Sequence, residues 1–160
     1  MKETLLTVLE NTRLADGIYR LRLAGDTSAI TAPGQFVNLK LSGFFLRRPI
    51  SVCDWENGEV TLIYKVLGHG TEAMTGMAVG TALDVLTGLG NGFDLSRSGE
   101  HPLLVGGGVG IPPLYGLAKR LTAQGKRVTA VLGFNRKSEF FLAEEFRALG
   151  AEVVIATADG

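Results

Sequence analysis

The sequence predicts two parts in series: an all-β antiparallel barrel of Greek-key type, then an incomplete α/β domain with a parallel sheet. Three observations support this prediction. Through the first part of the chain, short segments of strand type alternate with turn residues. After a polar stretch at 96–100, the pattern changes to apolar runs and helical spacing. There the order strand, helix, strand, helix, strand is typical of a parallel sheet with crossover helices.

The barrel is predicted from six short strands. Residues 19–23 alternate between apolar and polar side chains, as expected for a strand with one face in water. The pair Asn57-Gly58 lies between two such runs and is a strong hairpin signal. Six strands at this spacing suggest a small barrel or a sandwich. The expected strands cover residues 5–9, 18–23, 36–41, 50–55, 60–66 and 82–86.

The second part is predicted from strands at 103–105, 127–134 and 153–156 and from helices at 114–122 and 138–149. Ser138 could cap the second helix, and Gly150 could end it. We place the domain boundary at 98, which gives a barrel at 1–98 and an α/β part at 99–160. Three strands and two helices are about half of a doubly wound sheet. We therefore expect the chain to be a fragment.

Charge and composition exclude several classes of function. The 160 residues carry 16 basic and 16 acidic side chains, so no basic excess favours nucleic acid or an anionic membrane surface. No signal-peptide pattern is present, and the apolar stretches are far shorter than the roughly 20 residues of a membrane span. The single cysteine, Cys53, cannot hold an iron–sulfur cluster and is expected to be buried. We therefore expect a cytoplasmic protein without a membrane or nucleic-acid partner.

The segment Arg47-Arg48-Pro49-Ile50-Ser51 places two arginines directly before a predicted strand. Pro49 favours an extended conformation at Arg48. An arginine held in this way suits a phosphate, because its planar fork can donate two charged hydrogen bonds. Ser51 adds a hydroxyl and a backbone N–H on the same strand. The alternative is a polar strand entry with an exposed arginine.

A second segment combines the run Ile63-Tyr64-Lys65-Val66 with the turn Gly68-His69-Gly70-Thr71. Tyr64 could stack on a planar ring system. Gly70 and Thr71 would begin a short helix, and the free N–H groups of a helix N-terminus bind anions. The alternative is an ordinary turn capped by Thr71.

A third segment contains a strand, a glycine turn and a helix start, with Gly106, Gly107, Gly108 and Gly110 before Pro112. Glycines let the backbone approach a ligand closely, and proline suits the first turn of a helix. The fingerprint G-x-G-x-x-G is not met in full, so a tight turn without a ligand is the alternative. His69 and His101 have no partners at metal-ligand spacing, and Glu139, Glu144 and Glu145 are expected on the solvated face of a helix.

Together these segments resemble the ferredoxin–NADP reductase superfamily, which joins a flavin-binding antiparallel barrel to a nicotinamide-binding α/β domain. The flavin motif of that superfamily is matched by residues 48–51, and its nicotinamide motif by residues 106–112. Within the superfamily the chain is most similar to the electron-transfer subunits of class 1B dihydroorotate dehydrogenases. That narrower resemblance rests on the same segments together with Gly90-Asn91-Gly92-Phe93 and the pair Pro112-Pro113, and it covers essentially the whole chain.

The resemblance implies FAD as cofactor and NAD(H) as electron donor. Arg48 would pair with the FAD pyrophosphate, and Pro49, Ile50 and Ser51 would line the flavin, with Ser51 near the ring. Residues 63–65 would contact the ribityl chain and the adenine side, Gly70 and Thr71 would contact the pyrophosphate, and residues 106–112 would receive NADH. No residue of the chain is required as an acid or base, because hydride transfer depends on how the two rings are positioned.

The resemblance also implies partners and a cluster that this chain does not hold. Electrons would pass to a [2Fe–2S] cluster, bound by four cysteines in a missing C-terminal region, and then to a catalytic subunit that binds FMN and interconverts dihydroorotate and orotate. We expect a hetero-oligomer for the full-length protein. Two alternatives stay open: the small subunit of another NAD(P)H-dependent ferredoxin or sulfide oxidoreductase, and a non-catalytic flavin- or nucleotide-binding module. NADH or NADPH is not decided, since Arg136 and Lys137 lie where a 2′-phosphate would be bound.

Overall fold

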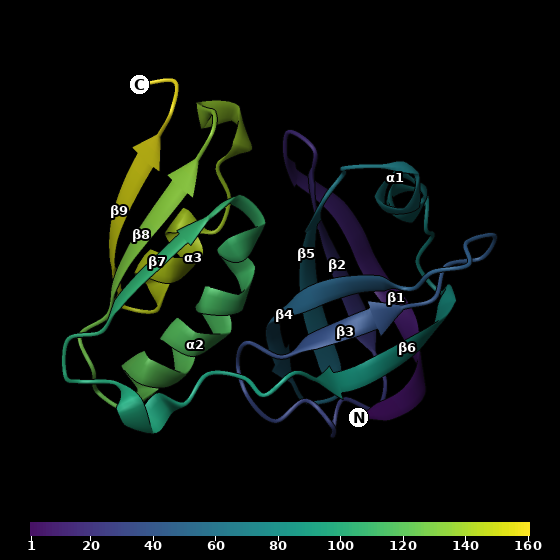
Figure 1. Ribbon diagram of the computed structural model, residues 1–160, viewed down its shortest axis with the longest axis horizontal. Coiled ribbons are helices and arrows are strands. Elements are labelled where there is room, and N and C mark those ends of the chain that lie inside the picture. The colour runs from purple at the N-terminus through teal and green to yellow at the C-terminus, as the bar shows by residue number, and fades with distance from the viewer.

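A computed structural model describes residues 1–160 and shows a closed six-stranded barrel beside a three-stranded parallel sheet (Figure 1). All strand pairs of the barrel are antiparallel, and the strands follow the order β1-β2-β5-β4-β3-β6, with β6 returning to pair with β1. The strands are β1 (Lys2–Ala15), β2 (Ile18–Ala24), β3 (Phe36–Leu39), β4 (Arg48–Glu56), β5 (Glu59–Lys65) and β6 (Ala82–Leu89). The predicted barrel is therefore confirmed.

Local sequence explains the barrel's turns and its interior. Asn57 and Gly58 join β4 to β5 with φ angles of 52° and 80°, as a two-residue hairpin turn of the mirror-image type requires. Alternating residues of the strands point inward and form one buried apolar cluster. Between β5 and α1 the chain leaves the barrel wall, and the short helix α1 (His69–Thr75) lies at one end of the barrel (Figure 1).

The second part carries its parallel strands in the order β7-β8-β9. Its elements are β7 (Leu103–Gly107), the 3₁₀ turn η2 (Gly108–Gly110), α2 (Pro112–Ala123), β8 (Thr129–Phe134), the 3₁₀ turn η3 (Lys137–Glu139), α3 (Ala143–Ala148) and β9 (Glu152–Thr157). A further 3₁₀ turn, η1 (Leu95–Arg97), lies in the connection from the barrel. Pro112 occupies the first turn of α2, where its missing N–H costs no hydrogen bond.

The two parts share a core. Ile18, Cys53 and Ile63 belong to barrel strands, but their side chains are buried in the same apolar cluster as the inner face of the parallel sheet and its helices. Helix α2 lies between the sheet and the barrel, against β4 (Figure 1). Burial raises the pKa of the Cys53 thiol and keeps it protonated. The opposite face of the sheet is uncovered and exposes Leu103, Val105 and Val154. None of the helices is both long and apolar enough to cross a membrane.

The predicted helix at 138–149 is wrong in its first half. The chain forms η3, then an extended stretch, and α3 begins only at Ala143. Phe141 and Leu142 are buried in the shared core, and Leu142 has a φ of 65°, which interrupts a right-handed helix. Ser138 is therefore not a helix cap. Gly150, with a φ of 88°, follows the end of α3 as predicted.

Candidate functional site

Two adjoining cavities bring most of the predicted site residues together. The first, the strand groove, has a volume of about 230 Å³ and runs between the start of β4 and the end of β5. The second, the arginine pocket, has a volume of about 520 Å³ and lies beside α1. Leu67 and Thr71 line both cavities. The strand groove is lined by Pro49, Ile50, Ser51, Ile63, Tyr64, Lys65, Leu67, Thr71 and Val109. The arginine pocket is lined by Phe44, Arg48, Leu67, Gly68, His69, Gly70 and Thr71.

The structure separates the roles of the two arginines that the sequence places side by side. Arg47 donates to both carboxylate oxygens of Asp84, at 3.0 and 3.1 Å, and to Glu3 at 2.9 Å, so both of its terminal nitrogens are bound to carboxylates of the barrel. Arg48 pairs with no carboxylate. Its Nη1 donates to the carbonyl of Leu46 at 2.6 Å, and the rest of its guanidinium borders the arginine pocket. Arg48 is therefore the cation that can meet an anionic ligand.

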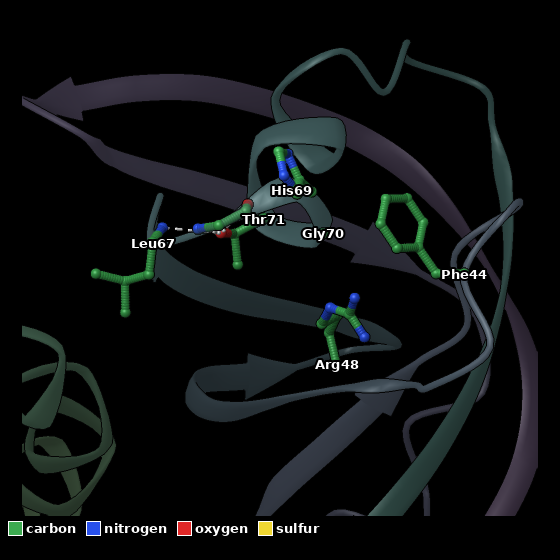
Figure 2. Close-up of a pocket in the computed structure, with 7 residues that line it drawn as sticks. Phe44, Arg48, Leu67, His69, Gly70 and Thr71 are labelled. Atoms are coloured by element: carbon green, nitrogen blue, oxygen red, sulfur yellow. Dashed lines mark hydrogen bonds between the residues drawn. The ribbon is translucent and has the colours of Figure 1, made fainter.

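The Arg48 guanidinium packs directly against α1 at Gly70. A Cβ added at Gly70 would overlap the Arg48 guanidinium, so any side chain at position 70 would displace it. On the other side the Cζ of Arg48 lies 5.0 Å from the ring centroid of Phe44. Figure 2 shows the guanidinium between Leu67 on one side and Phe44 on the other. This arrangement holds a positive charge at the pocket without neutralising it.

The Arg47–Asp84 pair predicts a pH dependence of stability. Hydrogen bonds from Arg47 hold the pKa of Asp84 below its usual value of 3.8 in the folded protein. The folded state therefore binds this proton less readily than the unfolded state, and the stabilisation, present at neutral pH, is lost as the pH falls below 3.8. In urea unfolding between about pH 7 and about pH 3, the parent should lose more free energy of unfolding than Asp84→Asn. Parallel curves for the two chains would contradict this role of the pair.

Thr71 organises the turn before α1 with its side chain. Its hydroxyl accepts hydrogen bonds from the backbone N–H of Leu67 at 2.9 Å and of Gly68 at 3.2 Å, and it donates to the carbonyl of Gly68 at 3.0 Å. The Thr71 side chain therefore closes this turn. Only the backbone of Thr71 is left for a ligand, together with the first N–H groups of α1, which lack partners inside the helix.

Successive side chains of β5 point to opposite faces of the barrel wall. This corrects the expectation that Tyr64 stacks on a ligand ring. Ile63 points out of the barrel into the shared core, whereas Tyr64 points into the barrel and is 1% exposed. The Tyr64 hydroxyl donates to Oδ1 of Asn11 at 3.0 Å, and its ring stacks on Tyr19. Tyr64 therefore cannot stack on a bound ring, because its own ring is enclosed on the inner side of the barrel wall.

Lys65 links the strand groove to the second part of the chain. Its ammonium lies 3.4 Å from the Glu139 carboxylate, and both side chains are largely buried. Glu139 is thus not on a solvated helix face, contrary to expectation, while Glu144 and Glu145 are exposed on α3 as expected. A ligand in the groove would meet a lysine whose charge is partly balanced.

The glycine turn has the predicted context of a strand before and a helix after. Gly108 has a φ of 51°, and a Cβ at Gly106 would lie 2.7 Å from Leu114 Cδ1, so both positions favour glycine. The turn reaches the barrel through Val109, which lines the strand groove. The structure does not place the glycines themselves in the groove. They lie beside it, at the carboxyl end of β7, where parallel sheets bind ligands.

Helix α2 fixes the distance between the turn and the groove. Its Gly116 packs directly on β4, since an added Cβ would lie 2.7 Å from the carbonyl oxygen of Cys53. One turn later, Lys119 donates to Asp54 at 2.7 Å, and the Arg120 guanidinium lies 3.6 Å from the ring centroid of Trp55. Because β4 begins at the groove and α2 begins after the glycine turn, this contact sets their relative position.

Sequence reasoning missed Phe44, Leu67 and Val109 as lining residues. Val109 lies within the glycine run, and Leu67 follows the β5 segment directly, so adjacency was a usable signal for both. Phe44 lies in the connection between β3 and β4, where two aromatic residues occur within a glycine-containing turn. Its position next to Arg48 depends on the path of this turn, which sequence patterns do not define.

Relatives with similar sequences are electron transfer subunits. Such a subunit of dihydroorotate dehydrogenase B (NAD(+)) from Bacillus pumilus is 46% identical, and the match covers 100% of this chain and 65% of the relative. The corresponding subunit from Fusobacterium nucleatum is 42% identical over 96% of this chain and 62% of its own length. The chain thus spans somewhat less than two thirds of these relatives. No protein-family model matches it.

Solved structures share the fold of both parts. An NADH-dependent reduced ferredoxin-NADP oxidoreductase of flavin-based electron bifurcation matches with a TM-score of 0.87 and 29% identity, over 98% of this chain and 58% of that chain. Phthalate dioxygenase reductase matches with a TM-score of 0.83 and 21% identity, over 99% of this chain and 52% of that chain. The barrel and the sheet that follows it therefore have the fold of ferredoxin reductase-like proteins.

Proposed function

We propose that this chain is an electron transfer subunit like its relatives from dihydroorotate dehydrogenase B, and that it binds FAD and passes electrons from NADH toward a dihydroorotate dehydrogenase catalytic subunit. The family resemblance would make that partner an FMN-binding subunit that interconverts dihydroorotate and orotate in pyrimidine biosynthesis. In the bound state FAD supplies the redox chemistry, since its ring accepts a hydride and releases electrons one at a time. The chain's own residues bind, orient and enclose it.

The observation that carries the proposal is the Arg48 guanidinium, which has no carboxylate partner and lines the arginine pocket beside the strand groove. Arg48 and the backbone at Gly70 would hold the FAD diphosphate at the arginine pocket. Ile50, Ser51 and Lys65 would line the flavin ring in the strand groove. The residues present therefore fit a flavin with an anionic tail, because the strand groove is mainly apolar and the adjoining arginine pocket contains the Arg48 guanidinium.

The nicotinamide would bind at the glycine turn. Gly107, Gly108 and Gly110 expose backbone at the carboxyl end of β7, and Pro112 begins the helix behind them. Val109 joins this turn to the strand groove, so a nicotinamide held there would lie beside the flavin ring. Lys65 and Glu139 span the same junction and would help to keep the two parts closed over the reacting rings.

The onward path of electrons would require groups from outside these residues. Cys53 is the only cysteine and is buried, so this chain supplies no thiolate set for a [2Fe–2S] cluster. In our proposal the cluster belongs to a further region of the full-length protein, in which the subunit pairs with its catalytic partner. Localisation in the cytoplasm is part of the same proposal, in keeping with a metabolic enzyme.

A direct test is anaerobic reduction of the bound flavin. The purified chain is saturated with FAD, freed of unbound flavin, and mixed with NADH or NADPH while the visible flavin absorbance is followed. We expect the absorbance to bleach with NADH, because the glycine turn and the groove adjoin. Retained flavin that neither nucleotide reduces would favour a non-catalytic flavin-binding module. Faster bleaching with NADPH than with NADH would favour another oxidoreductase of the superfamily.

A further inference from the structure

A polar side chain on β1 holds the helix that borders the arginine pocket. We propose that Asn11 is a positioning residue for FAD binding. By fixing the carboxyl end of α1 to the barrel, Asn11 keeps Gly70 against the Arg48 guanidinium and so holds that guanidinium where the diphosphate would bind. This inference rests on the proposed flavin function and adds to it a residue that lines neither cavity.

The Asn11 amide binds the carbonyl groups at the end of α1. A helix leaves its last four carbonyl groups without partners inside the helix. Asn11 Nδ2 donates to the carbonyl of Met74 at 2.7 Å, and it lies 3.2 Å and 3.4 Å from the carbonyl oxygens of Met77 and Thr75. The last turn of α1 contains no basic side chain that could bind these carbonyls instead. Asn11 therefore ties this end of the helix to β1.

Tyr64 sets the orientation of the Asn11 amide. The Tyr64 hydroxyl donates to Asn11 Oδ1 at 3.0 Å, so the amide oxygen faces Tyr64 and the N–H groups face the carbonyls of α1. Tyr64 is itself fixed, because it is buried on the inner side of the barrel and its ring stacks on Tyr19. The tyrosine that cannot contact a ligand thus belongs to the network that holds α1.

The link from Asn11 to Arg48 runs through α1. A helix of seven residues is too short to be stable by itself, so contacts with the barrel must hold it in place. Met74 is one such contact, buried in the barrel core, and Asn11 is another. At the other end of α1, Gly70 lies directly against the Arg48 guanidinium (Figure 2). Because Arg48 forms only one hydrogen bond within the chain, to Leu46, a displaced α1 would leave the guanidinium free to move.

Loss of the Asn11 contacts should act as a shift between two populations. The observed affinity for FAD is reduced by the fraction of chains in which α1 holds Arg48 in place. Asn11→Asp is the sharpest probe of this shift, because aspartate has nearly the same shape and can still accept the Tyr64 hydrogen bond. It cannot donate to the carbonyls of α1, and its negative charge would be repelled by them.

The first test compares matched variants. Dissociation constants for FAD are measured by flavin fluorescence on the parent, Asn11→Asp, Tyr64→Phe and Asn57→Asp, each shown by urea unfolding to be folded. We expect Asn11→Asp to weaken FAD binding roughly 3- to 30-fold and Tyr64→Phe to weaken it roughly 2- to 10-fold. Asn57→Asp makes the same chemical change in the exposed β4–β5 turn, at the end of these strands away from the groove, and should bind FAD like the parent.

A double-mutant cycle separates positioning of Arg48 from a general loss of stability. When Asn11→Asp is added to Arg48→Ala, FAD binding should weaken by less than about twofold, because the guanidinium that Asn11 positions is already absent. Equal losses in both backgrounds would overturn the inference, since Asn11 would then act independently of Arg48.

Parent-like FAD affinity in Asn11→Asp would also overturn the inference. If that variant does not fold, parent-like FAD affinity in Tyr64→Phe would overturn it instead, because the amide would then need no fixed orientation. A parent chain that binds no FAD would contradict the proposed function itself.

Discussion

Arg48→Ala is expected to weaken FAD binding roughly 10- to 150-fold, since a charged hydrogen-bond pair contributes about 1.5–3 kcal/mol. The effect should be large because no carboxylate neutralises Arg48, and its guanidinium is held against the Gly70 backbone at the arginine pocket. Flavin fluorescence titration of the parent and the variant measures the change. The fold should be retained, because the side chain forms only one hydrogen bond within the chain, to Leu46.

The adjacent arginine gives a matched control. Arg47→Ala removes the same charge one residue earlier, but that charge is already paired with Asp84 and Glu3. This variant should lower the urea midpoint of unfolding more than Arg48→Ala does, and it should change the FAD affinity of the folded chain much less. If both variants weakened FAD binding equally, net charge rather than a positioned phosphate contact would explain the affinity for FAD.

Gly116→Leu is expected to lower the free energy of unfolding by about 1–3 kcal/mol and to slow flavin reduction by NADH. The added side chain would have to enter the contact between α2 and β4, where a Cβ alone would lie 2.7 Å from the Cys53 carbonyl oxygen. Leucine stabilises a helix relative to glycine by about 1 kcal/mol at most, so the steric cost should exceed the gain in helix propensity. Displacing α2 would move the glycine turn away from the strand groove.

The residues proposed to bind FAD lie on the barrel, so this variant should separate FAD binding from flavin reduction. We expect Gly116→Leu to bind FAD with nearly the parent affinity and to bleach more slowly with NADH in stopped-flow absorbance. Gly99→Leu is the control, because an added Cβ there meets nothing within 4 Å. Reduction at the parent rate in Gly116→Leu would show that the α2–β4 contact does not set the distance between the two sites.

Much of the fold could be predicted from the sequence because its signals are local. All six barrel strands were expected, and Asn57 and Gly58 fix the β4–β5 turn with two positive φ angles. The glycine turn and Pro112 likewise define the junction of β7 and α2. The segments that carry the candidate site were found for the same reason, since a strand entry or a turn needs particular residue types at adjacent positions.

The remainder depends on contacts between distant residues. The start of α3 is delayed because Phe141 and Leu142 are buried in a core to which the barrel also contributes. The direction of Tyr64 follows from the alternation of β5 within a closed barrel, and its ring therefore pairs with Tyr19 rather than with a ligand. Arg47 is paired with a carboxylate and Arg48 is not, and this difference depends on where Asp84 lies, 37 residues along the chain from Arg47. Such pairings cannot be read from local patterns.

Titration of the purified 160-residue chain with FAD at equilibrium shows whether the strand groove and the arginine pocket together form a flavin dinucleotide site. We expect saturable binding of one FAD per chain, with a changed flavin absorbance and quenched fluorescence, and competition by ADP. A correctly folded chain that binds no FAD even at a large excess of the cofactor would contradict it.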